Sequence, residues 1–325
     1  MKKNKILITG AAGFIGSHLT EKFIQQGYKV VAFDQYNSLG SRGWLEDSKY
    51  KNQIEFVLGD IREYGSVYNA MKDCYAAIHL AALIGIPYSY KSPLAYVRTN
   101  VEGTYNLLES AKNLNIKKIL ITSTSETFGT GKIIPMNEEH PINAQSPYAA
   151  SKIAADQLAL SYHKSFKLPV TIIKPFNTYG PRQSARALIP SIIIQCLNKN
   201  KKIKIGNLKP TRDLTYVGDT CNAFLEIFKT NLPGEIINIG NNNEISVKEL
   251  CDKIFMNFST KIIISQDKRR IRPNKSEVNR LICDNKKILS LTKWKPKTNL
   301  ENGIKMTIKW LKNNKKNYKS NLYNV

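Results

Sequence analysis

Tyr148 and Lys152 carry the clearest chemical signal in this sequence, because they lie four residues apart in the stretch Tyr148-Ala-Ala-Ser-Lys152. A tyrosine hydroxyl, with a reference pKa of about 10, is a weak base at neutral pH unless a nearby cation stabilises its phenolate. Lys152 can supply that cation, since residues four apart share one face of a helix. Thr124, at the end of an apolar run, can donate to the same substrate oxygen. These residues together predict a hydride-transfer site with Tyr148 as the base.

A glycine-rich loop near the N-terminus predicts a dinucleotide site. The stretch Gly10-Ala-Ala-Gly13-Phe-Ile-Gly16 follows a buried strand expected over residues 5–9 and opens a helix expected over residues 14–26. Small residues let the backbone approach a pyrophosphate, and the helix N-terminus attracts its charge. Glycines alone serve many tight turns, so the signal depends on the whole set of strand, loop, helix and downstream acid.

The downstream acid is Asp34, which ends a second apolar run at residues 29–34 and lies 18 residues after Gly16. A carboxylate at this position binds the 2′-hydroxyl of the adenosine ribose. It would repel the additional phosphate of NADP. The sequence therefore predicts NAD as the cofactor.

Strand-like and helix-like stretches alternate along the chain, which predicts an α/β fold with a doubly wound parallel Rossmann sheet. The further strands are expected at residues 54–59, 76–80, 118–122, 170–174 and 235–239, and the longer helices at residues 93–113 and 147–166. Ser146 and Pro147 have the residue types of an N-cap and a first helical residue.

After about Pro175 the pattern becomes irregular and rich in Pro, Gly and Arg, which is typical of a smaller lobe built from loops. We expect an NAD-binding Rossmann domain over residues 1–174, to which residues 216–240 return. Residues 175–215 and 241–325 are expected to form a smaller C-terminal substrate-binding lobe.

The formal net charge of +24 raises the question of nucleic-acid binding. Most lysines are spread along the chain beside asparagines, as in residues 198–202, a pattern that favours a solvated surface. Only the stretches 269–273 and 210–213 concentrate arginines with turn residues, and a diphosphate-bearing small molecule would satisfy both. We expect no nucleic-acid partner.

Cysteine, histidine and hydropathy patterns point to a soluble cytoplasmic protein without a metal. The five cysteines and four histidines show no paired or metal-ligand spacing. The apolar runs are too short to span a membrane, and a strand expected by residue 5 leaves no room for a signal peptide.

Four stretches carry a resemblance to a known family. Residues 9–18, 79–82, 148–152 and 174–182 resemble the extended short-chain dehydrogenase/reductase family of nucleotide-sugar epimerases and dehydratases, and the similarity covers nearly the whole chain. The resemblance implies that Tyr148 is the base, Lys152 its partner and Thr124 a hydroxyl donor. It also implies a set of cofactor contacts, namely Gly10, Gly13, Phe14, Ile15, Gly16, Asp34, Asp60, Ile61, Leu80, Ala81 and Ala82, together with Tyr148 and Lys152.

The substrate contacts implied by the same resemblance are Asn177, Arg186, Arg212 and Arg272, which would hold a nucleotide diphosphate. A bidentate guanidinium is a usual partner of a phosphate. The alternatives are a turn cap for Asn177, a solvated side chain for Arg272 and, among the cofactor contacts, a strand-end cap for Asp60.

Glu126, in Ser123-Thr-Ser-Glu126, decides which reaction the resemblance implies. The family's 4-epimerases usually have small, uncharged residues after the hydroxyl residue, whereas 4,6-dehydratases have a glutamate at the position of Glu126. Oxidation at C4 makes the C5 proton acidic, and a carboxylate beside it can remove that proton while the C6 hydroxyl leaves as water. The alternative is a surface acid that opens the turn at residues 127–129.

Ser125 departs from the dTDP-glucose dehydratases, which have an aspartate there as the acid for the leaving hydroxyl. The Thr-Ser-Glu form resembles GDP-mannose dehydratases, which implies that Glu126 serves as both base and acid, and Ser125 stays open as the alternative acid. It also resembles UDP-glucuronate decarboxylases, and these four residues do not separate the two reactions.

Two longer stretches, residues 181–190 and 210–219, are similar to the NAD-dependent 4,6-dehydratases of legionaminic-acid biosynthesis. These act on a GDP- or UDP-linked N-acetylglucosamine, and GDP-N-acetylglucosamine is our preferred substrate. The expected helices at residues 93–113 and 147–166 correspond to those that pair in the family's homodimers, although their apolar faces also suit an intrachain core. The alternatives are a 4-epimerase, a UDP-glucuronate decarboxylase or an NAD-binding sensor without turnover.

Overall fold

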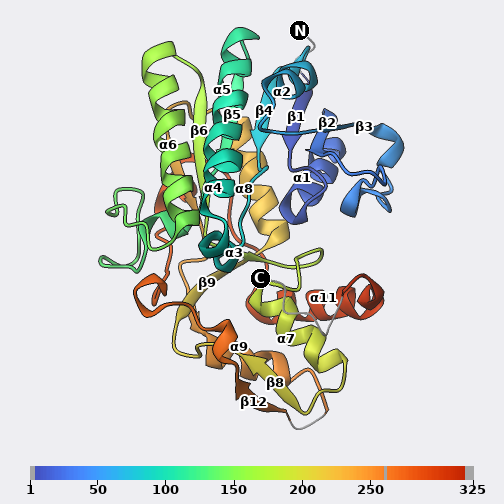
Figure 1. The fold of residues 1–325 in the computed structure, drawn as a ribbon, viewed down its shortest axis with the longest axis vertical. Helices are drawn as coiled ribbons and strands as arrows, with labels where there is room; N and C mark the ends of the chain where they lie inside the picture. Colours follow the sequence, from blue (N-terminus) through green and yellow to red (C-terminus); the bar gives the residue numbers. More distant parts are fainter. Residues whose placement is uncertain (1–3, 260–261, 319–325) are drawn as a thin grey trace.

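The computed structural model describes residues 4–259 and 262–318. Its central element is a sheet of seven parallel strands in the order β10-β6-β5-β4-β1-β2-β3, which confirms the predicted doubly wound α/β fold (Figure 1). The strands are β1 (Lys5–Thr9), β2 (Lys29–Gln35), β3 (Ile54–Gly59), β4 (Ala76–His79), β5 (Lys118–Thr122), β6 (Val170–Pro175) and β10 (Ile236–Ile239).

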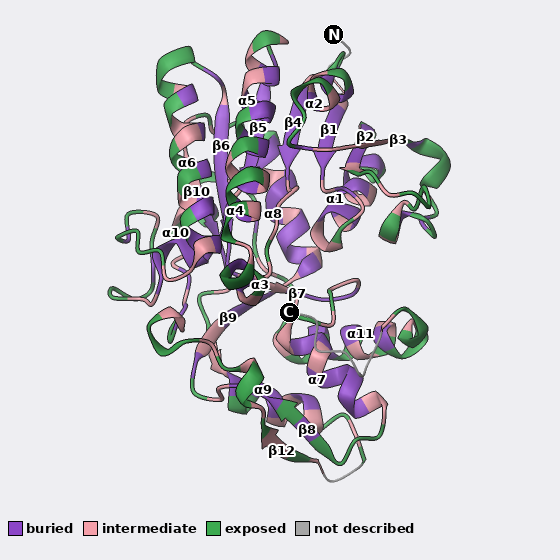
Figure 2. Cartoon of the chain, viewed as in Figure 1, coloured by how far each residue is buried: buried purple, intermediate pink, exposed green. Residues whose placement is uncertain are grey.

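Helices cover both faces of this sheet because its strands are apolar on both sides. In β1, Ile6 and Ile8 point into one hydrophobic core and Leu7 into the other, as the alternation of a strand requires. The first core includes residues of α1 (Phe14–Gln25) and α8 (Val217–Thr230), and the second includes residues of α2 (Tyr64–Met71), α5 (Gly103–Asn113) and α6 (Pro147–Phe166). Figure 2 shows the buried strands between these helical layers.

The helix expected over residues 93–113 is not a single α-helix. It consists of α4 (Pro93–Tyr96), a π-helical segment η3 (Val97–Glu102) and α5. The side chain of Asn100, within η3, accepts from the Leu83 amide at 2.8 Å and donates to the Leu83 carbonyl at 3.0 Å. π-helical turns often occur at functional sites, and this one holds the segment that follows β4.

A smaller lobe lies beyond the carboxyl edge of the sheet (Figure 1). Its core includes Ile193, Leu250 and Ile304. The lobe contains α7 (Leu188–Leu197), β8 (Lys202–Ile205), α9 (Val247–Phe255), β12 (Ile263–Gln266) and α11 (Leu300–Asn313). A three-stranded sheet, ordered β11-β9-β7, joins the lobes and is formed by β7 (Asn177–Tyr179), β9 (Thr211–Tyr216) and β11 (Glu244–Ser246).

The chain crosses between the lobes more than once. After β9 it returns to the large sheet through α8 and β10, and β10 pairs with β6. The chain also forms two short helices, α3 (Ile86–Lys91) and α10 (Lys286–Leu291). Residues 1–3, 260–261 and 319–325, which belong to the units expected from the sequence, lie outside the described residues.

Candidate active site

The carboxyl edge of the large sheet gathers the residues that the sequence analysis selected. β1 lies between β2 and β4, so the connections from β1 lead to opposite sides of the sheet, and doubly wound folds bind their ligands at the carboxyl ends of the strands at such a point. Gly10 follows β1, Leu80 follows β4, Thr124 follows β5 and Asn177 begins β7 directly beyond β6. Parallel strands end at one edge, which is why residues distant in sequence meet here.

Two positions of the glycine loop accept only glycine. Gly10 has φ +68°, and a Cβ there would lie 2.8 Å from the Ala81 amide nitrogen. A Cβ on Gly16 would lie 2.0 Å from the Gly10 carbonyl oxygen. Gly13 is the N-cap of α1. No side chain therefore caps the amides of the first helical turn, which includes Phe14 and Ile15. This uncapped turn fits a pyrophosphate group.

Asp34 lies at the end of β2 and holds the glycine loop. Its Oδ2 accepts from the Ala12 amide at 2.6 Å, and its Oδ1 accepts from the Gln35 amide at 2.8 Å. Burial raises the pKa of this carboxyl, and the two amide bonds oppose that rise. Each carboxylate oxygen has a further lone pair, so Asp34 can also accept a ribose hydroxyl.

Two further predicted contacts lie beyond β3. Asp60 forms a bidentate ion pair with Arg62, which lowers the pKa of Asp60. Ile61 is buried against Gly103, where an added Cβ would lie 2.9 Å from its side chain. The side chain of Ile61 therefore packs inside the core against the start of α5.

His79 and Thr9 fix the turn after β4. Thr9 Oγ1 accepts from the amides of Leu80 and Ala81, each at 3.2 Å, and lies 2.7 Å from His79 Nδ1. The Thr9 hydroxyl proton must then point at Nδ1, which makes Nε2 the protonated nitrogen, 3.3 Å from the Thr104 hydroxyl. This network fixes Leu80 and Ala81, with Ala82 next in the chain, beside the glycine loop.

Tyr148 is buried at the start of α6. The helix begins at Pro147, and the Ser146 side chain accepts from the Ala149 amide at 3.1 Å, which confirms the predicted cap. Burial raises the pKa of Tyr148, the neighbouring Thr124 side chain opposes that rise, and the charge of Glu126 adds to it. A buried phenol beside a carboxylate needs a cation before it can act as a base.

Lys152 is the cation that α6 brings to this position. Its Nζ donates to the Thr122 carbonyl at 2.6 Å, which anchors it to the carboxyl end of β5. Burial lowers the pKa of Lys152, and the nearby Asp156 carboxylate opposes that change. An ammonium group has three donors, so Lys152 can bind a cofactor hydroxyl or the Tyr148 oxygen in addition to Thr122.

Glu126 lies in the turn η4 (Ser125–Phe128) and is 8 % exposed, so it is not the surface acid of the alternative interpretation. Its Oε2 is 3.7 Å from Nη1 of Arg272. The same turn buries Ser125, the second candidate acid, at 2 % exposure. Thr124 Oγ1 caps this turn by accepting a hydrogen bond from the Glu126 amide at 3.2 Å. This bond fixes the Thr124 side chain relative to the backbone that carries the Glu126 carboxylate.

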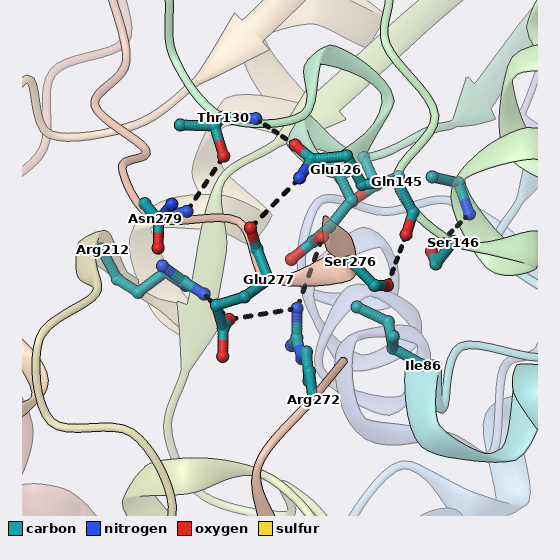
Figure 3. A network of polar contacts seen from close by, with 12 residues as sticks. Ile86, Glu126, Thr130, Gln145, Ser146, Arg212, Arg272, Ser276, Glu277 and Asn279 are labelled. Carbon is teal, nitrogen blue, oxygen red and sulfur yellow. Dashed lines mark hydrogen bonds and ion pairs between the residues drawn. The ribbon is translucent and has the colours of Figure 1, made fainter. Parts of the chain in front are cut away.

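The predicted substrate residues lie on the joining sheet and in the smaller lobe. Arg212, on β9, is 3.4 Å from Glu277, and Figure 3 shows both beside Arg272 and Glu126. The Asn177 Oδ1 atom is buried without a hydrogen-bond partner among the described residues. Arg186 contacts Gly85 at the start of α3, where an added Cβ would lie 2.8 Å from its Nη1. A cleft of about 210 Å³ between α3 and residues 269–273 adjoins Arg272.

A buried ion pair beneath the site was not anticipated from the sequence. Lys174 and Asp156 are each 2 % exposed and 3.2 Å apart. Asp156 also accepts from the Ser123 hydroxyl at 2.6 Å, and Lys174 donates to the Thr127 hydroxyl at 3.0 Å. These contacts join β5, η4, α6 and β6 directly behind Thr124. The signal was a lysine inside an apolar strand, since charged residues are almost never fully buried unless paired.

Glu277 is the second residue that the sequence analysis missed. It lies outside every helix and strand, in a segment that follows Arg272, and no periodic pattern or motif singles it out. Its proximity to Arg212 and Arg272 appears only when the smaller lobe packs against the sheet (Figure 3).

Neither a metal centre nor a membrane span is seen in the described part of the chain. No three histidine, cysteine or acidic side chains cluster in a way that could hold a metal ion. None of its helices has the length and apolar character needed to cross a bilayer.

Comparisons with known proteins agree with this geometry. The family model described as "GDP-mannose 4,6 dehydratase" matches residues 7–307. A putative UDP-glucose 4-epimerase from Methanocaldococcus jannaschii is 36 % identical, covering 95 % of this chain and 99 % of that protein. A UDP-N-acetyl-alpha-D-glucosaminuronate decarboxylase from Bacillus cytotoxicus is 31 % identical, covering 95 % and 98 % respectively.

The fold also matches a solved enzyme with its cofactor. The crystal structure of the dTDP-glucose 4,6-dehydratase DesIV from Streptomyces venezuelae, with NAD bound, superimposes with a TM-score of 0.87 at 27 % identity, covering 97 % of this chain and 99 % of that one. The chain belongs to the extended short-chain dehydrogenase/reductase family of NAD-dependent nucleotide-sugar dehydratases and epimerases. NAD, the cofactor predicted from Asp34 and the glycine loop, is the cofactor of this family.

Proposed function

We propose that this enzyme catalyses the NAD-dependent 4,6-dehydration of a nucleotide-linked N-acetylglucosamine, with GDP-N-acetylglucosamine as the preferred substrate. The observation that carries the proposal is the buried Glu126 carboxylate, which the turn η4 holds two residues after Thr124. A 4-epimerase has no use for a second base at this position, whereas a dehydratase needs one at C5.

The residues present fit NAD. The open first turn of α1 suits the pyrophosphate, Asp34 suits the adenosine ribose, and Lys152, four residues after Tyr148 on α6, could bind a cofactor hydroxyl. The nicotinamide supplies the hydride acceptor for C4 and later the donor for C6. Every proton in the reaction must be moved by side chains of the chain itself.

Tyr148 begins the reaction by taking the proton of the C4 hydroxyl as hydride leaves C4, which produces a ketone. Lys152 and Thr124 favour this step, because a cation and a hydroxyl donor stabilise the tyrosine oxygen as it becomes negative. The ketone makes the C5 proton acidic, and Glu126 removes it. The C6 hydroxyl then leaves as water after it receives a proton from Ser125 or Glu126, and hydride returns to C6 while a proton returns to C5.

The arginines of the smaller lobe support a nucleotide diphosphate as the part of the substrate that this lobe binds. Arg272 lines the cleft beside α3, Arg212 lies near Arg272, and Asn177 adds a buried polar atom without a partner among the described residues. Guanidinium groups match phosphate oxygens in charge and geometry. N-acetylglucosamine is our choice of sugar because we expect residues 181–190 and 210–219 to be those of a legionaminic-acid dehydratase, and the test below decides it.

Mass spectrometry of the product tests this proposal directly. Incubation with GDP-N-acetylglucosamine, UDP-N-acetylglucosamine and UDP-glucuronate in parallel should show loss of one water from an N-acetylglucosamine nucleotide, with the GDP form reacting faster. Loss of carbon dioxide from UDP-glucuronate alone would identify a decarboxylase. An unchanged mass with every substrate would contradict dehydration.

We further propose that the enzyme works as a homodimer in the cytoplasm. Four apolar side chains are 45–58 % exposed on the helical layer of α4, η3, α5 and α6, namely Leu94, Val97, Tyr105 and Phe166. Pairing of this layer with a second copy would cover them. The five cysteines are all buried as free thiols, which suits a reducing compartment. Sedimentation at micromolar concentration should give the mass of two chains.

A further inference from the structure

One nitrogen of Arg272 lies midway between two carboxylates. Its Nη1 is 3.7 Å from Glu126 Oε2 and 3.8 Å from Glu277 Oε1 (Figure 3). Both distances exceed that of a hydrogen bond, and Nη1 is buried without a hydrogen-bond partner among the described residues. The guanidinium is thus attracted by both acids and directly bonded to neither.

Glu277 is held in place by its backbone. The Gln145 side chain donates to the carbonyls of Lys275 and Glu277, each at 3.1 Å, and accepts from the Thr130 amide at 2.6 Å. The Ser276 hydroxyl donates back to the Gln145 carbonyl. Because Gln145 directly precedes the N-cap of α6, these contacts fix Glu277 relative to the helix that carries Tyr148 (Figure 3).

The side chain of Glu277 also has a second cationic partner. Its Oε1 is 3.4 Å from Nη2 of Arg212, and it is 12 % exposed, so solvent screens this charge only weakly. Two arginines and two glutamates make this cluster neutral overall. Neutralising Glu277 would leave Arg272 with Glu126 as the one remaining carboxylate of the cluster.

A direct bond to Arg272 would harm the role proposed for Glu126. A guanidinium that hydrogen bonds a carboxylate stabilises its charged form and so weakens it as a base. We propose that Glu277 is a positioning residue, which holds Arg272 away from Glu126 and so keeps that carboxylate able to remove the C5 proton. This inference rests on the proposed function of Glu126.

Glu277→Gln tests the inference, because glutamine keeps the shape of the side chain and removes its charge. With whichever N-acetylglucosamine nucleotide loses water, C4 oxidation should continue while water elimination slows about 10- to 100-fold, the effect of one charged hydrogen bond. Bound NADH should therefore accumulate, and kcat should fall with KM changed less than about threefold. Glu277→Asp, which keeps the charge, should recover part of the rate.

A double-variant cycle separates this role from general support of the fold. In an Arg272→Gln background there is no guanidinium to restrain, so adding Glu277→Gln should change kcat less than about twofold. Glu244→Gln, which loses a carboxylate from the Arg280 pair in the same lobe, is the matched control and should accumulate no NADH. NAD affinity and melting temperature should stay close to those of the parent in all variants.

The inference is overturned if Glu277→Gln turns over within twofold of the parent, or if it lowers kcat equally in the parent and Arg272→Gln backgrounds. Glu126→Gln distinguishes this failure from failure of the proposed function. If Glu126→Gln accumulates NADH and Glu277→Gln does not, only the positioning role falls. If neither accumulates NADH, the role of Glu126 as the C5 base falls and the positioning role falls with it.

Discussion

The carboxylate of Asp34 accepts a hydrogen bond from the Ala12 amide at 2.6 Å, which ties the end of β2 to the centre of the glycine loop. The residue predicted to recognise the ribose therefore also shapes the loop that faces the pyrophosphate. The neighbouring chain strengthens this tie, since the Trp44 amide donates to the Ala12 carbonyl at 3.1 Å. Cofactor selectivity and loop geometry thus depend on one side chain, and two substitutions separate them.

Asp34→Ala should weaken NAD binding about 10- to 100-fold, because it removes a charged acceptor for the ribose and releases the loop. Asp34→Asn should retain much of the NAD affinity, since its amide oxygen can still accept from Ala12. Both should narrow the preference for NAD over NADP by removing a repulsive charge. Titration with both cofactors measures this, and unchanged selectivity in both variants would exclude Asp34 from the cofactor site.

Tyr148→Phe should abolish C4 oxidation and leave NAD affinity nearly unchanged, because the hydroxyl acts on the sugar. The loss of turnover should exceed about 100-fold, the range for a general base. Single-turnover absorbance of NADH measures oxidation, and calorimetry measures binding. Turnover within tenfold of the parent would contradict the assignment of Tyr148.

Asp156→Asn should lower the free energy of unfolding by about 3–5 kcal/mol, because it leaves the buried ammonium of Lys174 without its counter-charge. Urea unfolding measures the change. Asp252→Asn is the control, since its ion pair with Lys248 is exposed and its loss should cost less than about 1 kcal/mol. Equal changes in the free energy of unfolding for the two substitutions would contradict a stabilising role for the buried pair of Lys174 and Asp156.

His79 should make the fold sensitive to acid. Burial lowers its pKa from 6.5 to about 3, so the folded state keeps it neutral while the unfolded chain binds a proton below pH 6.5. Above pH 6.5 His79 is neutral in both states, so its contribution to the free energy of unfolding is complete. Between pH 6.5 and 5, proton binding by the unfolded chain lowers that free energy by about 2 kcal/mol. His79→Asn should reduce this pH dependence in urea unfolding. An equal slope of the free energy of unfolding against pH in the parent and in His79→Asn would contradict this role of His79.

The sequence predicted the parts of the structure that follow from local pattern. Apolar runs bounded by turn residues located the strands of the large sheet, and the residue types of Ser146 and Pro147 located the start of α6. The glycine spacing located the loop after β1, because the positions of Gly10 and Gly16 leave no room for a Cβ. These features depend on neighbours in the chain, so a single sequence contains them.

Contacts between distant segments were not predictable in the same way. The π-helical segment around Asn100 depends on its bonds to Leu83, which no helical periodicity encodes. The pair of Lys174 and Asp156, and the position of Glu277 beside Arg272, arise only from packing of separate elements. The sequence identified Arg212 and Arg272 by residue type, but it did not show that glutamates share them.

The central claim is that Glu126 removes the C5 proton of a 4-keto sugar in a 4,6-dehydration. The most direct measurement runs the parent enzyme in heavy water on an N-acetylglucosamine nucleotide labelled with deuterium at C4 in one sample and unlabelled in another. We predict that the C4 label moves to C6 and that one solvent deuterium appears at C5 of the 4-keto-6-deoxy product. Return of the label to C4 without solvent deuterium at C5 would identify an epimerase and contradict the account.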